Sequence, residues 1–194
     1  MTARSQEKNK MTQAEYLTLE RTSLDVKHEF FNGDVFAMVG AKKNHILINA
    51  NLTRELGNTF KTNKSTCKVF PNDMRVRIEN GYVYPDIAIS CGVSEFEDDE
   101  VDTLTNPIVI IEILSDSTEA FDRGKKFAYY RAISTLQEYI LVAQNEYHVE
   151  QFTRIDDGWK YRSYVNTDQV LKIEPVNCQL PLSEIYWDIE FESK

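Results

Sequence analysis

The chain alternates between two patterns of apolar positions, one with the period of a helix and one with the period of a strand. Three segments are predicted as helices: 12–21, 43–60 and 119–133. The first opens with Thr-Gln-Ala-Glu, which has the form of a capping box. The second carries an apolar stripe, formed by Ile48, Leu52, Leu56 and Phe60. The third contains Gly124, which weakens its helical preference.

Strand patterns occupy much of the remaining chain, at 68–78, 82–90, 108–114, 138–144, 148–154 and 159–165. A hairpin is expected over 26–39, with its tight turn at Asn32-Gly33, and further turns are expected at 79–81 and Asp157-Gly158, where residues that tolerate positive φ angles adjoin strand runs. The strand 138–144 is apolar through its middle, so we expect it to be central. The order of elements predicts an α/β (mixed α+β) fold, with a mixed central β-sheet flanked by helices and extra antiparallel hairpins.

Length and composition favour one domain. The chain has 194 residues, which suffices for one domain with a real core. Residues 1–10 are polar and are expected to form a disordered tail, so the domain is assigned to 11–194. No apolar run approaches the roughly 20 residues of a membrane span, and the N-terminus lacks the apolar core of a signal peptide. These features predict a cytoplasmic protein without a membrane partner.

The cysteines and the net charge exclude further classes. Cys67, Cys91 and Cys178 show no paired spacing, which suits a reducing compartment and offers no zinc site. The net charge of −9 argues against a protein that simply coats nucleic acid. A local basic cleft stays possible, because a summed charge does not describe its distribution. Six acids fall within 94–102, and we interpret this run as a solvated acidic loop.

One acid lies where an apolar side chain is expected. Glu112 interrupts the strand 108–114, and an ionised carboxylate there costs several kcal/mol unless it is paired. Asp86 lies beside the apolar run of 82–90, so the two carboxylates can meet at one end of the sheet if these strands are neighbours. Such a pair favours a cation between its members, and Mg²⁺ prefers oxygen ligands. With Lys126 directed at the same corner, the set fits phosphodiester hydrolysis.

Several ordered motifs resemble the Uma family, to which endonuclease activity is assigned by inference. They are YPDIAI, PIVIIEILSDST, FDRGKKFAYYR and LQEYILV, within a resemblance that runs from about Met11 to Trp187. Pro85-Asp86 matches the family's PD, and Glu112-Ile113-Leu114 matches its Glu-x-Leu/Val, where an apolar residue replaces the usual lysine. The displaced lysine falls on Lys126. The resemblance also places Glu29 as an additional acid and matches His45 and Asp73 to two further family positions.

What the resemblance implies goes beyond the residues themselves. It implies the restriction-endonuclease-like PD-(D/E)XK fold, DNA as the substrate, and Mg²⁺ or Mn²⁺ as the cofactor. Asp86 and Glu112 would then be metal ligands, and Lys126 and Glu29 would complete the catalytic set. Tyr130, one turn after Lys126, is a further candidate to line the cleft, although packing is its simpler role.

Each candidate also has a simpler structural explanation. Glu112 would be a strand-end acid paired with a basic residue, and Asp86 would cap a turn beside Pro85. Lys126 would be a solvated helical lysine paired with Asp122, four residues earlier. The remaining three have equally ordinary alternatives: a solvent-facing strand acid for Glu29, a half-buried histidine for His45, and a turn residue for Asp73.

Three functional hypotheses follow. The first is a divalent-metal-dependent endonuclease that uses Asp86, Glu112 and Lys126, with Glu29 assisting. The second is a catalytically silent binding or assembly module on the same fold, which the absence of a lysine two residues after Glu112 supports. The third is a metal-dependent hydrolase that acts on something other than nucleic acid. A homodimer is the default expectation, because symmetric dimers are the commonest assembly and suit enzymes that cut a duplex.

Overall fold

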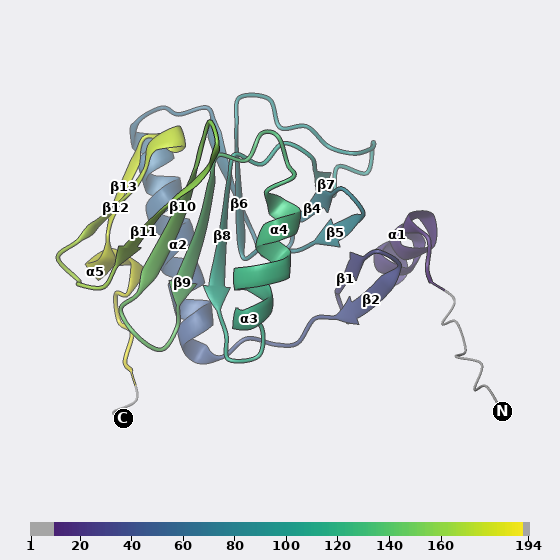
Figure 1. The fold of residues 1–194 in the computed structure, drawn as a ribbon, viewed down its shortest axis with the longest axis horizontal. Helices are drawn as coiled ribbons and strands as arrows, with labels where there is room; N and C mark the ends of the chain where they lie inside the picture. Colours follow the sequence, from purple (N-terminus) through teal and green to yellow (C-terminus); the bar gives the residue numbers. More distant parts are fainter. Residues whose placement is uncertain (1–9, 192–194) are drawn as a thin grey trace.

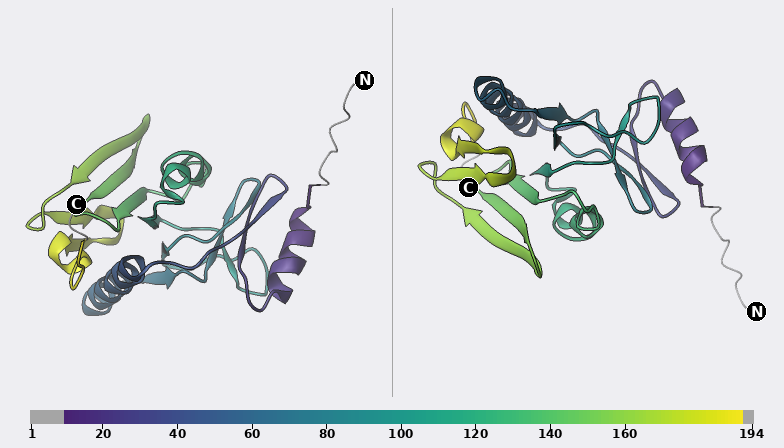
Figure 2. Two further views of the ribbon diagram at one scale, coloured as in Figure 1. Left: turned by 90° about the horizontal axis from the view of Figure 1, so that it is seen from below. Right: turned by 90° about the horizontal axis from the view of Figure 1, so that it is seen from above.

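Six strands form the larger of two main sheets, and helices cover both of its faces (Figures 1 and 2). The computed structural model describes residues 10–191, so nearly all of the tail predicted for residues 1–10 lies outside the described residues. The strands, in spatial order, are β11 (Gly158–Tyr164), β10 (Val149–Ile155), β9 (Glu138–Ala143), β8 (Val109–Leu114), β6 (Ile87–Cys91) and β3 (Cys67–Pro71). Only the β8–β9 pair among these is parallel, so the sheet is mixed, and β9 is central as predicted.

The two faces of this sheet are covered by different helices. Helix α2 (Lys43–Thr62) lies on one face, with its predicted apolar stripe fully or almost fully buried. The opposite face carries a run of short helical segments, α3 (Glu119–Phe121), a π-helical turn η1 (Asp122–Lys126) and α4 (Phe127–Tyr130). Because side chains alternate along a strand, Glu112 shares the face of Ile110 and Leu114, toward this second set of helices. The helix predicted over 119–133 ends at Tyr130 in the structure, and it includes a widened π-helical turn around Gly124.

A second, five-stranded sheet lies to one side of the first (Figure 1). Its strands, in spatial order, are β2 (Asp34–Ala37), β1 (His28–Phe31), β5 (Gly81–Val83), β4 (Arg75–Ile78) and β7 (Thr103–Leu104). Helix α1 (Gln13–Thr22) packs on it through Tyr16, whose ring centroid lies 5.1 Å from those of both Phe30 and Tyr82. The predicted capping box of α1 and the turn at Asn32-Gly33 are both confirmed.

The predictions of unbroken strands over 68–78 and 82–90 were wrong. The two segments do pair with each other, but each is divided, so that β3 pairs with β6 in the large sheet and β4 pairs with β5 in the small one. One interruption is at Asn72, whose φ angle of 31° leaves the strand conformation. The other contains Pro85, which has no N–H group to donate to a sheet.

The C-terminal elements were not predicted. They are the antiparallel pair β12 (Val170–Ile173) and β13 (Cys178–Pro181), the 3-10 turn η2 (Glu174–Val176) and helix α5 (Leu182–Ile185). Their buried residues join the cluster that packs around α2, so they complete the core on that face. Within residues 10–191, none of the helices has the length and apolar character that crossing a membrane requires.

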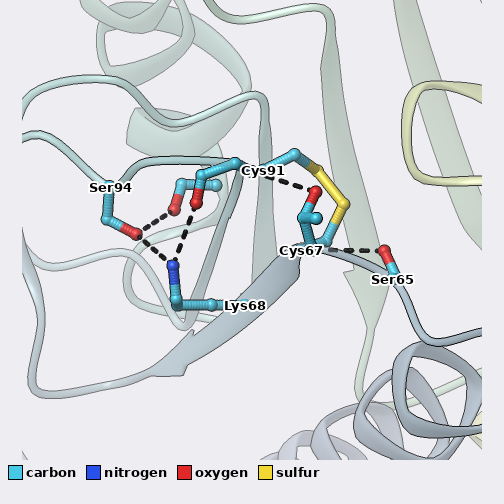
Figure 3. The surroundings of a disulfide bond; sticks show 8 residues. Ser65, Cys67, Lys68, Cys91 and Ser94 are labelled. Atoms are coloured by element: carbon cyan, nitrogen blue, oxygen red, sulfur yellow. Dashed lines mark hydrogen bonds between the residues drawn. A yellow bond between two sulfur atoms is a disulfide. The ribbon is translucent and has the colours of Figure 1, made fainter.

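Two of the three cysteines form a disulfide bond, which corrects the expectation of unpaired cysteines that suit a reducing compartment. Cys67 and Cys91 are directly opposite each other on β3 and β6 and are bonded (Figure 3). Cys178 is a buried free thiol. The next residue on β3, Lys68, holds the adjoining loop by donating to the Gly92 carbonyl and the Ser94 hydroxyl. The disulfide thus links the edge strand to its neighbour.

Thiol titration provides a test of this pairing. In denaturant without a reducing agent, one reactive thiol per chain is expected, and three after reduction. Removing the bridge with Cys67→Ser is expected to lower the free energy of unfolding by about 2–4 kcal/mol, because the unfolded chain loses a cross-link. Cys178→Ser in the same assay controls for the loss of a thiol alone. Three reactive thiols before reduction would contradict the pairing.

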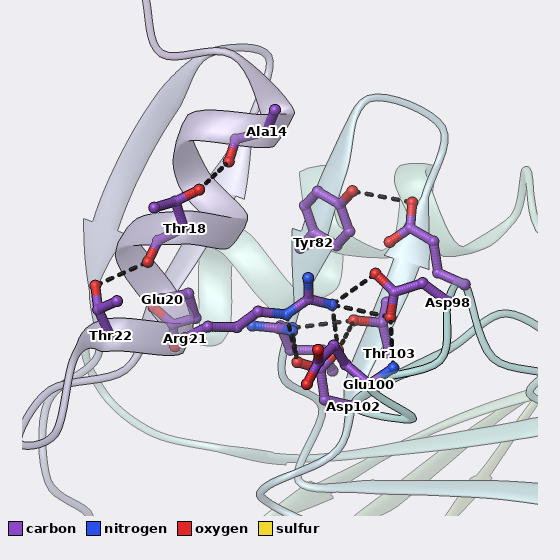
Figure 4. A network of polar contacts seen from close by, with 12 residues as sticks. Ala14, Thr18, Glu20, Arg21, Thr22, Tyr82, Asp98, Glu100, Asp102 and Thr103 are labelled. Atoms are coloured by element: carbon purple, nitrogen blue, oxygen red, sulfur yellow. Dashed lines mark hydrogen bonds and ion pairs between the residues drawn. The ribbon is translucent and has the colours of Figure 1, made fainter.

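The acidic segment 94–102 is more ordered than a solvated loop. Asp102 and Asp98 both bind Arg21 of α1 (Figure 4), and Asp102 Oδ2 also lies 2.5 Å from Nη2 of Arg75, which is 2% exposed. Hydrogen bonds from Arg21 keep the pKa of Asp102 well below its usual range, despite partial burial, and Arg75 and Thr103 lower it further. The prediction of a purely solvated run was therefore wrong for its C-terminal part.

Asp102→Asn is expected to lower the free energy of unfolding by about 2 kcal/mol, because it leaves the Arg75 guanidinium buried without its carboxylate. Since the folded pKa of Asp102 is depressed, its contribution is present above the ordinary carboxyl pKa and is lost as the pH falls through the folded value. Urea unfolding at neutral pH measures the difference, with Asp99→Asn, an exposed acid of the same loop, as the control. Equal effects of the two substitutions would refute a special role for Asp102.

Candidate active site

The two acids singled out in the sequence lie next to each other at one end of the large sheet. Ile87 of β6 pairs with Ile111 of β8, so the residue before β6, Asp86, comes opposite Glu112. The backbone N–H of Asp86 donates to Glu112 Oε2 at 3.3 Å. The backbone N–H of Ile113 donates to Asp86 Oδ2 at 2.7 Å. Antiparallel pairing of two strands that are consecutive in the prediction thus brings these carboxylates together.

Lys126 reaches this corner from the π-helical turn. Its Nζ lies 2.9 Å from Glu112 Oε1, 3.1 Å from Glu29 Oε1 and 3.8 Å from Asp122 Oδ1. The residue is only 6% exposed, so it is not a solvated helical lysine. It forms no ion pair with Asp86 among the described residues, and it therefore contacts one of the two central acids directly. Widened helical turns of this kind often occur at functional sites.

Glu29 and Tyr130 belong to the same cluster. Glu29 comes from β1, and its Oε1 accepts a hydrogen bond of 3.0 Å from the backbone N–H of Tyr84. Its side chain is 13% exposed, which excludes the simpler role of a solvent-facing strand acid. Tyr130 is fully buried, and its hydroxyl donates to Glu112 Oε1 at 2.8 Å. The tyrosine therefore packs in the core and also orients the central glutamate.

His45 joins the cluster and Asp73 does not. His45, near the start of α2, has its Nε2 2.8 Å from Asp86 Oδ1, while Asn49 of the same helix donates to the Asp86 carbonyl. Asp73 instead pairs with Lys27, and its side chain is 82% exposed. The geometry gives Asp73 no place among these acids. Its role, like those of the other site residues, stays a prediction.

Asp122 is the acid that the sequence analysis treated only as a helical partner of Lys126. It is 3% exposed and lies on the same side of the site as Glu112 and Lys126. The signal that could have identified Asp122 was its position four residues before Lys126. Residues four apart on a helix lie on the same face, so a lysine that points into the core places Asp122 there as well.

The cluster holds more carboxylates than one ammonium group can balance. Burial raises the pKa of Glu112 well above its usual range, and although Lys126 lowers it, Asp122, Asp86 and Glu29 raise it further. Burial also raises the pKa of Asp122. Burial alone would lower the pKa of Lys126, but the carboxylates of Glu112, Glu29 and Asp122 outweigh it and raise that pKa well above normal. Lys126 therefore keeps its proton, and the cluster has four carboxyl groups around this one ammonium group.

This surplus of oxygen donors fits a hard divalent cation such as Mg²⁺ or Mn²⁺. Asp86 and Glu112 are the residues that would hold it, since both lie at the open end of the sheet and line the same cavity. Across the described residues, however, no three histidine, cysteine, aspartate or glutamate side chains are already arranged as a metal centre. The oxygens of Asp86 and Glu112 instead accept hydrogen bonds from protein donors, so their assignment as metal ligands stays a prediction.

A cavity of about 770 Å³ opens over this cluster. Its lining includes the carboxylates, Lys126 and His45. The hydroxyl-rich turn after β8 contributes Ser115, Ser117 and Thr118. The lining residues of the β1–β2 hairpin and of the segment after it are largely apolar. The geometry therefore combines an acidic pole, one buried ammonium group and an apolar wall in one space large enough for a nucleotide-sized ligand.

Comparisons with known proteins agree with one another. Residues 13–183 match the sequence profile of the Uma2 family, described as "Putative restriction endonuclease". Two proteins of Synechocystis sp. (strain ATCC 27184 / PCC 6803 / Kazusa) are similar: "Uncharacterized protein slr1290", 31% identical with 94% of each chain covered, and "Uncharacterized protein sll1609", 36% identical with 76% of this chain and 82% of that one covered. A solved structure from Anabaena variabilis ATCC 29413, described as "a putative nuclease belonging to DUF820", superposes with a TM-score of 0.75 at 15% identity, covering 91% of this chain and 97% of that one. The mixed α+β fold predicted from the sequence is thus a nuclease-like fold.

Proposed function

This chain belongs to the Uma2 family of restriction-endonuclease-like proteins, and from that premise we propose that it is a divalent-metal-dependent endonuclease that hydrolyses phosphodiester bonds of DNA. The observation that carries the proposal is the convergence of Asp86, Glu112 and Lys126 in one cavity, from three separate segments of the chain. A buried glutamate and a half-buried aspartate beside a buried lysine cost stability, and catalysis gives such an arrangement a reason.

The roles of the residues follow from their contacts. Asp86 and Glu112 would hold the metal, which when bound polarises a phosphate and lowers the pKa of the attacking water. Lys126 keeps its proton and stabilises the negative charge that develops on the phosphate oxygens. Glu29 fixes the position of the Lys126 amine, and Tyr130 fixes one oxygen of Glu112. His45, near the start of α2, fixes the position of Oδ1 of Asp86.

A second candidate is a catalytically silent binding module on the same fold. The specific observation in its favour is that both central carboxylates already accept hydrogen bonds from protein donors, with no metal centre preformed among the described residues. A metal-dependent hydrolase that acts on something other than nucleic acid is the third hypothesis. The cofactor, Mg²⁺ or Mn²⁺, the homodimer and the cytoplasmic location all stay predictions.

Cleavage of supercoiled plasmid tests the proposal. Purified protein is incubated with Mg²⁺, Mn²⁺ or EDTA, in parallel with Glu112→Ala. The endonuclease hypothesis predicts metal-dependent nicking by the wild type that the variant loses. Identical products from both proteins would assign the cleavage to a contaminant, and absence of cleavage by folded wild-type protein would favour the silent module.

A further inference from the structure

An aromatic wall lines the cavity beside the acidic cluster. Phe31 and Phe36 come from the β1–β2 hairpin, and Phe121 comes from α3. Phe36 is 53% exposed, and the following residues Met38 and Val39 are exposed as well. Exposed apolar side chains that cluster beside a polar site commonly mark a surface that binds a ligand. This wall is not used by the chemistry of the carboxylates and lysine.

The wall is built on fixed supports. Phe31 is 6% exposed, stacks on Tyr129 with ring centroids 5.3 Å apart, and meets Phe121 edge-on at 5.1 Å. Phe36 rests against Phe31, with centroids 5.8 Å apart. The Phe31 ring is thus buried and held by its neighbours, while the Phe36 ring that packs on it is more than half exposed. A preformed aromatic surface binds a flat ring with little loss of side-chain entropy.

The charges around the cavity disfavour a duplex as the main contact. The three lysines of the described lining each have a carboxylate partner, since Lys126 binds Glu112, Lys27 binds Asp73 and Lys42 binds Asp116. Duplex DNA is held mostly by several basic residues that neutralise its phosphates. Binding at this cavity must therefore draw more of its strength from bases than from the phosphate backbone.

We propose that the cavity takes one unstacked nucleotide of a single-stranded DNA segment, with its base against the free face of Phe36. The inference rests on the proposed endonuclease function and names its substrate class. In a duplex both faces of each base are covered by neighbours, whereas single strands, gaps and frayed ends offer a free face. A volume of about 770 Å³ accommodates such a ligand, and the hairpin carries the stacking ring to the same space as the carboxylates.

Fluorescence of 2-aminopurine tests this inference without requiring cleavage. The intact protein is titrated, in buffer containing Ca²⁺, into an oligonucleotide with one 2-aminopurine, presented either as a single strand or in a blunt duplex. Quenching and binding of the single strand are expected, at least about tenfold tighter than binding of the duplex. Phe36→Ala is expected to weaken single-strand binding about tenfold and to reduce the quenching, and Phe36→Trp to retain both.

Tyr161→Ala is the matched control, because Tyr161 is 52% exposed but does not line the cavity. Equal binding by Phe36→Ala and wild type, or an equal effect of Tyr161→Ala, would overturn the inference. So would a change in molecular mass of Phe36→Ala in sedimentation, since that would assign the wall to an interface between copies of this chain. If the single strand binds and quenches as expected while neither the plasmid nor the single strand is cleaved with Mg²⁺ or Mn²⁺, the stacking site stands and the endonuclease proposal falls.

Discussion

Lys126→Met is expected to lower the free energy of unfolding by about 3 kcal/mol and to abolish cleavage. The substitution removes the one ammonium group that, among residues 10–191, lies within 4 Å of Glu112 and Glu29, so their carboxylates lose that ion-pair partner. Breaking a buried ion pair from one side typically costs about 3–5 kcal/mol, and proton uptake by the raised-pKa Glu112 offsets part of that cost. Urea unfolding at neutral pH, without metal, measures the change.

The pH dependence of this loss has a definite sign. Without Lys126, the pKa values of the carboxyl groups in the folded protein lie still higher. A carboxyl group whose pKa is raised in the folded state lowers the free energy of unfolding as the pH rises above its pKa in the unfolded state. The deficit of Lys126→Met is therefore expected to shrink as the pH is lowered toward about 5. Adding Glu112→Gln to the variant should recover part of the stability. Lys125→Met, at the exposed neighbouring lysine, is the control, and an equal loss there would refute the role of the buried ammonium group.

Asp86→Asn is expected to lower metal-dependent cleavage on the order of 10³-fold, because the site loses one of two charges that would hold the metal. Asparagine keeps the shape of the side chain and an oxygen that can accept the N–H of Ile113. The fold should therefore stay intact, with a free energy of unfolding within about 1 kcal/mol of the wild type. Rates are compared on plasmid DNA at equal concentrations of folded protein.

Asp116→Asn controls for a general effect of charge at the cavity. Asp116 lies on the turn after β8, lines the same cavity and is 68% exposed, and it pairs with Lys42. Its substitution should change the rate only a few-fold. If Asp86→Asn cleaves at the wild-type rate, the residue is a structural acid that holds His45 and the end of β8. If both variants fail equally, the loss reflects electrostatics of the whole cavity.

Much of the fold followed from the sequence because its signals were local. The apolar stripe of α2, the capping box at Thr12 and the turn at Asn32-Gly33 each depend on residues a few positions apart, and all three were confirmed. The division of the two long predicted strands was missed, because strand propensity does not indicate that one hairpin is shared between two sheets. The φ angle at Asn72 is decided by that tertiary arrangement.

The disulfide was missed for a related reason. In the observed hairpin, Cys67 and Cys91 are opposite each other at its base, beyond the predicted strand ends. Counting outward from the turn at 79–81 brings the two residues to nearly the same level, so the register held the information, although the spacing of cysteines alone did not. The prediction that Asp86 and Glu112 can meet depended on their strands being neighbours, and the pairing of β6 with β8 fulfils that condition.

The contacts of Lys126 could not be predicted from the residues close to it in the sequence. An i,i+4 pair with Asp122 is the ordinary expectation, and the sequence cannot show that the turn widens and buries the amine. The contacts with Glu29 and Glu112 join segments nearly 100 positions apart or on different elements, which only the packed structure specifies. The resemblance to family motifs supplied Glu29, whereas Glu112 and Lys126 were already candidates from the strand that Glu112 interrupts and the helix that follows it.

Calorimetric titration of Mn²⁺ into metal-free protein tests most directly whether Asp86 and Glu112 form a metal site. Wild type, Glu112→Gln and Asp116→Asn are compared under identical conditions, with unfolding curves recorded for each. A metal site at Asp86 and Glu112 predicts saturable Mn²⁺ binding by the wild type, loss of that binding in Glu112→Gln, and its retention in Asp116→Asn, with all three proteins folded. Unchanged Mn²⁺ binding by folded Glu112→Gln, or no binding by the wild type, would contradict it.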